Sequence, residues 1–129
     1  MSSEFDLIRR WFSPATDHTL LAGGDDAALV APAPGCALAI TTDMLVEGMH
    51  FLPGADPASL GHKTLAVNLS DLAAMGARPR WAFLALALPD ADEDWIAAFA
   101  SGFLALAGVA GGSVAGGVGN GCRSRWSAK

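Results

Sequence analysis

Oxygen-bearing side chains occur at three places where this sequence changes character. Asp26 follows a double glycine, Asp43 follows a strand-like apolar run, and Asp71 lies in an apolar helical pattern. Two hydroxyls, Thr41 and Thr42, directly precede Asp43. Carboxylate and hydroxyl oxygens are hard ligands of the kind that Mg²⁺ prefers, particularly when the ion also holds water and phosphate oxygens. If the fold brings these residues together, they predict a magnesium site for a phosphorylated ligand.

Each of these residues also has a purely structural interpretation. Residues 23–26, Gly-Gly-Asp-Asp, are typical of a turn. Asp71 could face solvent from the outer side of a helix. His50 and Glu47, nearby in the chain, are more often surface or packed residues than ligands. Asp43 is harder to dismiss, because open α/β sheets bind ligands at the C-terminal ends of their strands.

Three helices are predicted to position these residues. Capping residues and apolar side chains at helical spacing predict a first helix that starts near Ser3 and stops before Pro14. Asp56-Pro57 starts a second helix, which continues until Gly76. A third helix begins after Asp92 and ends near residue 107. On the second helix, Thr64, Asn68 and Asp71 form one polar stripe.

Strands are predicted between these helices. Residues 25–32 alternate weakly, residues 36–43 are expected to form a buried strand, and residues 81–88 are an apolar run too short for a typical helix. Residues 112–115 could hold one more short strand. In residues 36–43 the side chains alternate between two faces, so Thr41 and Asp43 share one side. The alternation of strands and helices indicates an α/β or α+β layer.

The length of 129 residues suits one globular domain, which we place at residues 1–107. Residues 108–129 are rich in glycine and form a divergent tail, with no Asp or Glu after Asp94. The two cysteines, Cys36 and Cys122, have no metal-ligand spacing and are predicted to be free thiols.

Composition argues against several classes of partner. The net charge of −5 disfavours nucleic acid, since a phosphate backbone attracts clustered Lys and Arg. No apolar run approaches the roughly 18–20 residues that span a bilayer, so no membrane partner is expected. The N-terminal residues lack the pattern of a secretory signal, which favours the cytoplasm. The glycine-rich phosphate-binding motifs G-x-x-x-x-G-K-[ST] and G-x-G-x-x-G are absent.

Four stretches, in order, resemble the N-terminal half of the thiamine-monophosphate kinase family: GGDDAALV, AITTDMLVEGMHF, LGHKTLAVNLSDLAAMGARPRW and LALALPD. The likeness covers about residues 4–107. The wider superfamily, which includes aminoimidazole ribonucleotide synthetase and selenophosphate synthetase, is less similar. The resemblance implies an α/β (α+β) fold like the N-terminal domain of aminoimidazole ribonucleotide synthetase. That fold is a mixed sheet with packed helices, and it forms a homodimer through the sheet.

The resemblance also implies a reaction and a set of site residues. Members of this family transfer a phosphoryl group from ATP to thiamine monophosphate, with several Mg²⁺ ions holding the phosphates. The positions that match metal ligands are Asp26, Thr41, Thr42, Asp43 and Asp71. His50 matches a substrate-contacting position. No protein side chain is expected to act as a nucleophile, since metal ions can align the phosphates and neutralise their charge.

The sequence departs from the family after the third helix. The family continues with a Gly-Gly-Asp-Thr segment, whose Asp binds metal, and with a second domain, whereas residues 110–117 here read AGGSVAGG. We therefore expect a truncated N-terminal part in which the second domain is absent. Two other hypotheses remain open: a non-catalytic, dimerising, metal-binding fragment, or another ATP-dependent member of the superfamily.

Overall fold

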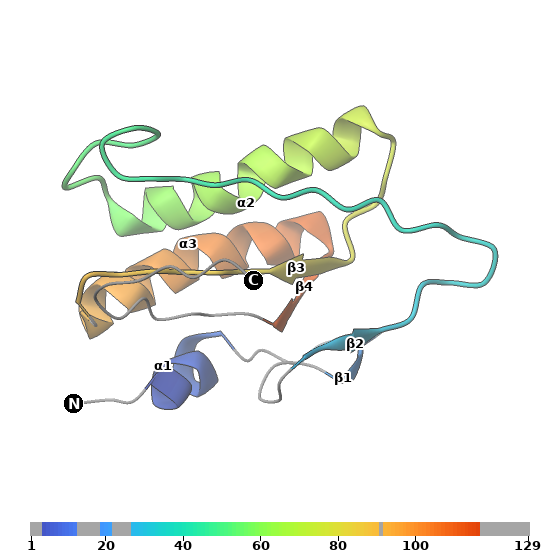
Figure 1. Ribbon diagram of the computed structural model, residues 1–129, viewed down its shortest axis with the longest axis horizontal. Coiled ribbons are helices and arrows are strands. Elements are labelled where there is room, and N and C mark those ends of the chain that lie inside the picture. The colour runs from blue at the N-terminus through green and yellow to red at the C-terminus, as the bar shows by residue number, and fades with distance from the viewer. Residues whose placement is uncertain (1–3, 13–18, 22–26, 91, 117–129) are drawn as a thin grey trace, which may run out of the picture.

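The computed structural model describes residues 4–12, 19–21, 27–90 and 92–116 (Figure 1). In chain order its elements are α1 (Glu4–Trp11), β1 (Thr19–Leu21), β2 (Leu29–Val30), α2 (Pro57–Ala74), β3 (Trp81–Phe83), α3 (Glu93–Ala110) and β4 (Ser113–Gly116). All three predicted helices are present. The two long helices, α2 and α3, pack side by side, and the short helix α1 packs against α3 (Figure 1).

Helix α2 begins where the sequence predicts. The Asp56 carboxylate accepts a hydrogen bond from the Ser59 backbone N–H at 2.8 Å, and Pro57 occupies the first turn, where its missing N–H costs nothing. The helix ends at Ala74, and Gly76 then takes a positive φ of 66°. Glycine adopts this conformation without the steric penalty of a side chain, so it lets the chain leave the helix.

Helix α3 is capped in the same way at its start. The Asp92 carboxylate accepts hydrogen bonds from the backbone N–H groups of Asp94 at 3.0 Å and Trp95 at 3.2 Å. The acidic residues of its first turn lie near the positive end of the helix dipole. The helix runs to Ala110, three residues past the predicted end near residue 107, and Gly111 terminates it with a φ of 76°.

Two glycines allow α2 and α3 to approach closely. A Cβ atom on Gly61 would collide with the backbone oxygen of Phe99, and one on Gly102 would collide with the backbone oxygen of Ala58. Each helix therefore places a glycine against the backbone of the other. At this contact a side chain on either glycine would have to push the helices apart.

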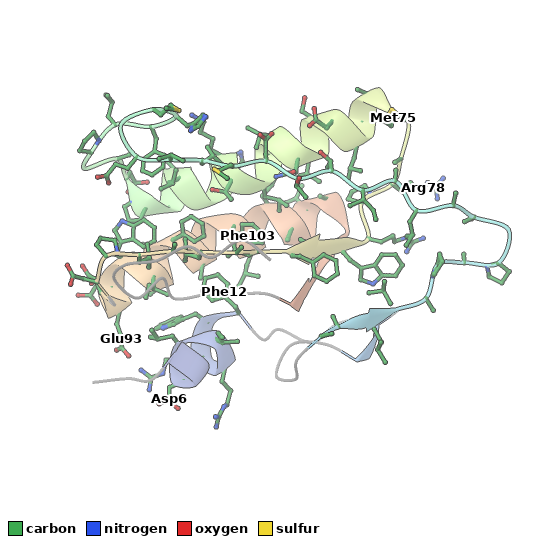
Figure 2. The ribbon with its side chains drawn as sticks, viewed as in Figure 1. Asp6, Phe12, Met75, Arg78, Glu93 and Phe103 are labelled. Carbon is green, nitrogen blue, oxygen red and sulfur yellow. The ribbon has the colours of Figure 1, made fainter. Side chains whose placement is uncertain are left out.

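The core lies around this helix pair. The buried apolar residues are Leu7, Phe12, Leu60, Leu65, Leu84, Ile96, Phe99, Ala100, Phe103 and Ala107. Phe99 is only 2% exposed and stacks against Trp95, with ring centroids 5.2 Å apart. Phe12, which directly follows α1, and Phe103 of α3, both labelled in Figure 2, belong to this same cluster. An exposed ion pair between Arg10 and Glu93, at 3.2 Å, also joins α1 to α3.

Helix α3 is long and apolar enough to cross a membrane by length and composition, a property that the sequence analysis did not expect of any segment. In the structure its buried side chains, including Ile96, Phe99 and Phe103, belong to the core cluster that it shares with α2. Core helices of soluble proteins share this length and apolar composition, so these two properties alone do not assign α3 to a membrane.

The strands differ most from the prediction. The described residues form two separate two-stranded sheets, antiparallel β1–β2 and parallel β3–β4, and not one mixed sheet. The predicted strand at residues 112–115 is confirmed as β4. Of the predicted strand at 25–32, the described residues 27–32 form only the shorter β2, and the predicted strand at 81–88 is present as the shorter β3.

The predicted buried strand at residues 36–43 is wrong. These residues belong to no strand, and apolar side chains such as Leu38 (47% exposed) and Ile40 (83% exposed) lie at the surface. The physical reason is pairing: a strand leaves its backbone groups unsatisfied until a neighbour binds them. In the described part of the chain no neighbouring strand pairs with residues 36–43. The helices need no such partner, because their backbone hydrogen bonds are internal.

Candidate functional site

Residues 36–46, called the extended segment below, meet helix α2 near its C-terminal end. The Thr41 hydroxyl donates a hydrogen bond to the Asp71 carboxylate, with 3.1 Å between Thr41 Oγ1 and Asp71 Oδ2. Thr41 and Asp71 are thirty residues apart in the sequence. The structure therefore joins two of the five predicted metal ligands, one from the segment and one from the helix.

The other predicted ligands are not gathered around this pair. Thr42 and Asp43 follow Thr41 in the segment, and both are exposed. Asp26 lies outside the described residues. Within the described ranges, no three His, Cys, Asp or Glu side chains come close enough together to hold a metal ion. The roles of Asp26, Thr42 and Asp43 as ligands stay predictions.

The predicted polar stripe of α2 serves two purposes. The Thr64 hydroxyl donates to the Leu60 carbonyl oxygen at 2.8 Å, and the Asn68 amide donates to the Thr64 carbonyl oxygen at 3.1 Å. Both side chains thus bind their own helix. Asp71 differs, because its side chain binds a distant segment through Thr41. One turn earlier, Asn68 Oδ1 is a buried oxygen with no hydrogen-bond partner.

Residues 46–51, called the His50 turn below, are tied together by hydrogen bonds. The backbone N–H of Val46 donates to His50 Nδ1 at 2.9 Å, and the backbone N–H of His50 donates to the Val46 carbonyl oxygen at 2.9 Å. The N–H of Gly48 donates to the Phe51 carbonyl oxygen at 2.8 Å. Gly48 has a φ of 81°, which favours glycine at this position. The predicted substrate-contacting residue is therefore part of a closed, exposed turn.

Sequence reasoning missed Lys63. Its ammonium group donates to the His50 carbonyl oxygen at 2.6 Å and so connects α2 to the His50 turn. One signal was available in the sequence, because Lys63 is the only lysine among residues 1–128 and immediately precedes the polar stripe. The sequence does not indicate the partner of Lys63, however, because that partner is a backbone carbonyl group.

The donor chemistry of the site fits a hard divalent cation. Thr41, Asp43 and Asp71 offer hydroxyl and carboxylate oxygens, which suit Mg²⁺ bound together with water and phosphate oxygens. The Thr41–Asp71 hydrogen bond is the observed contact that connects the two elements carrying these donors. Of the carboxylates predicted to hold such an ion, the structure describes Asp43 and Asp71, and their role as ligands stays a prediction.

Comparisons with known proteins relate this chain to one family. Residues 24–121 match the family model "AIR synthase related protein, N-terminal domain". The thiamine-monophosphate kinase of Haemophilus influenzae is 52% identical over 104 residues, which are 78% of this chain and 32% of that protein. The thiamine-monophosphate kinase of Escherichia coli strain K12 is 53% identical over 106 residues, which are 80% of this chain and 33% of that protein.

A solved structure extends the similarity to the fold. The crystal structure of thiamine-monophosphate kinase from Stenotrophomonas maltophilia K279a matches with a TM-score of 0.74 and 53% sequence identity, over 81% of this chain and 34% of that one. The chain thus spans about a third of the length of these relatives. Since the family model covers most of the sequence, the chain belongs to the AIR synthase related protein family, as its N-terminal domain.

Proposed function

We propose that this chain is the metal- and nucleotide-binding part of a thiamine-monophosphate kinase, which transfers the γ-phosphoryl group of ATP to thiamine monophosphate and yields thiamine diphosphate and ADP. The observation that carries the proposal is the 53% identity to the Stenotrophomonas maltophilia enzyme, combined with a TM-score of 0.74. At this identity the two chains share about half of their aligned residues as well as their fold. The Thr41–Asp71 contact supports the same site.

The residues of the chain would bind and position the reactants. Bound Mg²⁺ would supply positive charge to the phosphate oxygens of both substrates. Asp26, Asp43 and Asp71 would hold the ions, with Thr42 as a further oxygen ligand. Thr41 would orient the Asp71 carboxylate through the hydrogen bond already present, besides offering its own oxygen. His50 would contact the phosphorylated substrate from the His50 turn. No side chain is assigned as a nucleophile, because phosphoryl transfer depends on alignment and charge neutralisation.

Magnesium binding tests the metal part of the proposal. We expect calorimetric titration of the 129-residue chain with Mg²⁺ to give heat that falls strongly in Asp43→Asn and in Asp71→Asn, because each change removes a charged ligand. Asp90→Asn is the matched control, since Asp90 is also exposed and lies outside the site. Equal heats from the wild type and all three variants would remove the proposed site.

A second candidate function is a non-catalytic fragment that binds metal and self-associates. It is favoured by the coverage of about a third of each kinase relative and by the absence of acidic residues after Asp94. We propose that residues 1–107 form the binding unit and that the sequence diverges from the kinases within residues 108–129, of which residues 108–116 complete α3 and β4. On this basis we expect the 129 residues alone to bind Mg²⁺ but to produce little thiamine diphosphate, because they span only about a third of the length of the kinase relatives.

A chimera separates the two candidates. Residues 1–107 would be joined to the remaining part of the Stenotrophomonas maltophilia kinase, and thiamine diphosphate formation would be measured beside the 129-residue chain. We expect turnover from the chimera and almost none from the short chain. Equal turnover by both would show that the added part is dispensable. A chimera that forms no thiamine diphosphate but uses ATP with another substrate of the superfamily would favour another ATP-dependent member.

Self-association is the remaining part of the proposal. Several large apolar side chains are exposed, including Leu38, Ile40, Met44, Leu52 and Phe83. A second copy of the chain could cover them, because unpaired extended backbone and apolar surface both favour strand addition. Light scattering at micromolar concentration should give the mass of a dimer. A monomer that binds no hydrophobic dye would contradict this expectation.

A further inference from the structure

We propose that Lys63 is a positioning residue that holds the His50 turn on α2, so that His50 offers its Nε2–H group to an anionic oxygen of the substrate. The proposal rests on the function proposed above, in which His50 contacts a phosphorylated substrate. It adds a residue, Lys63, and a specific donor atom.

The hydrogen bonds of the turn fix the state of the neutral imidazole ring. His50 Nδ1 accepts the backbone N–H of Val46 at 2.9 Å, so this nitrogen carries no proton. A neutral imidazole has one protonated nitrogen, and here it must be Nε2. Within the described residues, Nε2 has no hydrogen-bond partner, and His50 is exposed. His50 therefore has a free donor, which suits an acceptor such as a phosphate oxygen.

Lys63 connects the turn to a rigid element. Its Nζ lies 2.6 Å from the His50 carbonyl oxygen, a short bond in which the donor is charged. On either side of Lys63, Leu60 and Leu65 are buried in the core, so the helix backbone at this point is well anchored. Through this hydrogen bond the anchored helix restrains the backbone of His50, the residue whose ring must be oriented. The ammonium group also adds positive charge beside His50, which favours an anionic ligand.

The first experiment measures the turn itself, without any ligand. In ¹⁵N-labelled full-length chain, ring nitrogen spectra should show the Nε2–H tautomer of His50, and the Val46 and His50 amides should exchange slowly with solvent. In Lys63→Met we expect a mixture of tautomers and amide exchange in the turn that is about tenfold faster, since a bond from a charged donor is lost. Lys63→Arg should restore part of the protection, because it keeps a charged donor.

Two comparisons make this result decisive. Arg78→Met removes one positive charge from the exposed residues after α2 and should leave the His50 turn unchanged. The amides of Phe99 and Phe103 in α3 serve as an internal reference for overall stability. The proposal is overturned if wild-type His50 carries its proton on Nδ1, if Lys63→Met leaves the turn unchanged, or if exchange accelerates equally in the turn and in α3.

The second experiment adds ligands with Mg²⁺ and follows the Nε2–H resonance of His50. Inorganic phosphate should shift this resonance in the wild type and shift it several-fold less in Lys63→Met. Thiamine monophosphate should act at lower concentration than inorganic phosphate. If neither ligand shifts Nε2–H, the proposed donor role of His50 is overturned. If phosphate acts and thiamine monophosphate acts no better, the proposed kinase function fails while the positioning role of Lys63 stands.

Discussion

The helix pair α2–α3 and the extended segment differ in how each is held in place. The two helices contribute most of the buried core, and they contact each other through glycines that lie against the backbone of the opposite helix. In the extended segment every residue except Thr41 and Leu45 is exposed, and the Thr41–Asp71 hydrogen bond joins the segment to α2. Stability thus resides in the helices, whereas three of the predicted metal ligands, Thr41, Thr42 and Asp43, lie in the segment. The four predictions that follow test this division.

The largest effect is expected where the core is densest. Phe99→Ala should lower the free energy of unfolding by about 3–5 kcal/mol, because it empties a site that is 2% exposed and stacked on Trp95. Val109→Ala, at a side chain that is 87% exposed on the same helix, is the control and should change stability little. Denaturant unfolding followed by circular dichroism measures both. Similar losses for the two variants would mean that α3 is not packed as described.

The contact between the helices should tolerate no added side chain. Gly102→Ala should destabilise the protein by about 1–3 kcal/mol, because its Cβ would press on the backbone of Ala58. Gly108→Ala is a matched change on the same helix with no atom within 4 Å of the new Cβ, and it should stabilise by about 0.5–1 kcal/mol. Thermal unfolding of both variants checks the opposite signs. The same sign in both would contradict the close approach.

The Thr41–Asp71 hydrogen bond between the extended segment and α2 should contribute little to stability. A double-mutant cycle with Thr41→Val and Asp71→Asn should give a coupling energy of about 0.5–1 kcal/mol, as expected for one partly exposed hydrogen bond. A parallel cycle with Thr42→Val in place of Thr41→Val should give no coupling. Denaturant unfolding of the single and double variants provides the values. A strong coupling through Thr42 would mean that the segment is rotated relative to this description.

The smallest effect is expected at the start of α2. The hydrogen bonds that Asp56 accepts from Ser59, chiefly from its backbone N–H, lower the pKa of that carboxyl below its ordinary value of 3.8. Because the folded-state pKa is the lower one, the stabilisation is present above pH 3.8 and is lost as the pH falls through the folded-state pKa. Asp56→Ala should therefore lower the unfolding midpoint slightly at neutral pH, and less in acid.

Asp56→Asn is the control for this prediction. Asparagine also caps helices but does not titrate, so it should keep most of the stability at neutral pH and lose the acid-dependent part. Midpoints measured between neutral pH and about pH 3 distinguish the variants, since this interval crosses the ordinary range of an aspartate. A difference between Asp56→Ala and the wild type that is constant with pH would show that the charge of Asp56 contributes nothing.

The helices could be predicted from the sequence because their signals are local. The structure confirms the predicted starts of two helices: α2 begins after Asp56, at Pro57, and α3 begins after Asp92, at two acidic residues. In α3 the apolar residues at helical spacing include Ile96, Phe99 and Phe103, and all three are buried. In α2 the same spacing places Leu65 in the core, whereas Met75, just past the end of the helix, is 76% exposed. Periodicity does not show where a packed face ends.

The strands could not be predicted as well, because pairing is a property of two segments. Residues 36–43 have the apolar content of a buried strand, yet no described strand pairs with them. In the predicted strand at residues 81–88, only Trp81–Phe83 finds a pairing partner, which is β4. Leu84 is buried without belonging to a strand. The overall fold class was recovered through the resemblance to the family and is supported by the solved structure that matches.

For the candidate site, the sequence predicts a set of oxygen ligands whose role as ligands stays a prediction. Two of them, Thr41 and Asp71, lie within hydrogen-bond distance of each other in the structure. Their direct hydrogen bond could not be foreseen, because it depends on how the extended segment lies on α2. Lys63 was missed because its partner is a backbone carbonyl, which every residue has.

The distribution of the core along the chain bears on the order of folding. Within the described residues, the buried core consists of Leu7 and Phe12 together with eight residues that all lie between Leu60 and Ala107. Strand β4 then returns to pair in parallel with β3, which closes a strand–helix–strand unit around α3. Contacts within such a continuous stretch close short loops and form quickly. We therefore expect residues 57–116 to form the folding nucleus, with α1 and the extended segment docking onto it later.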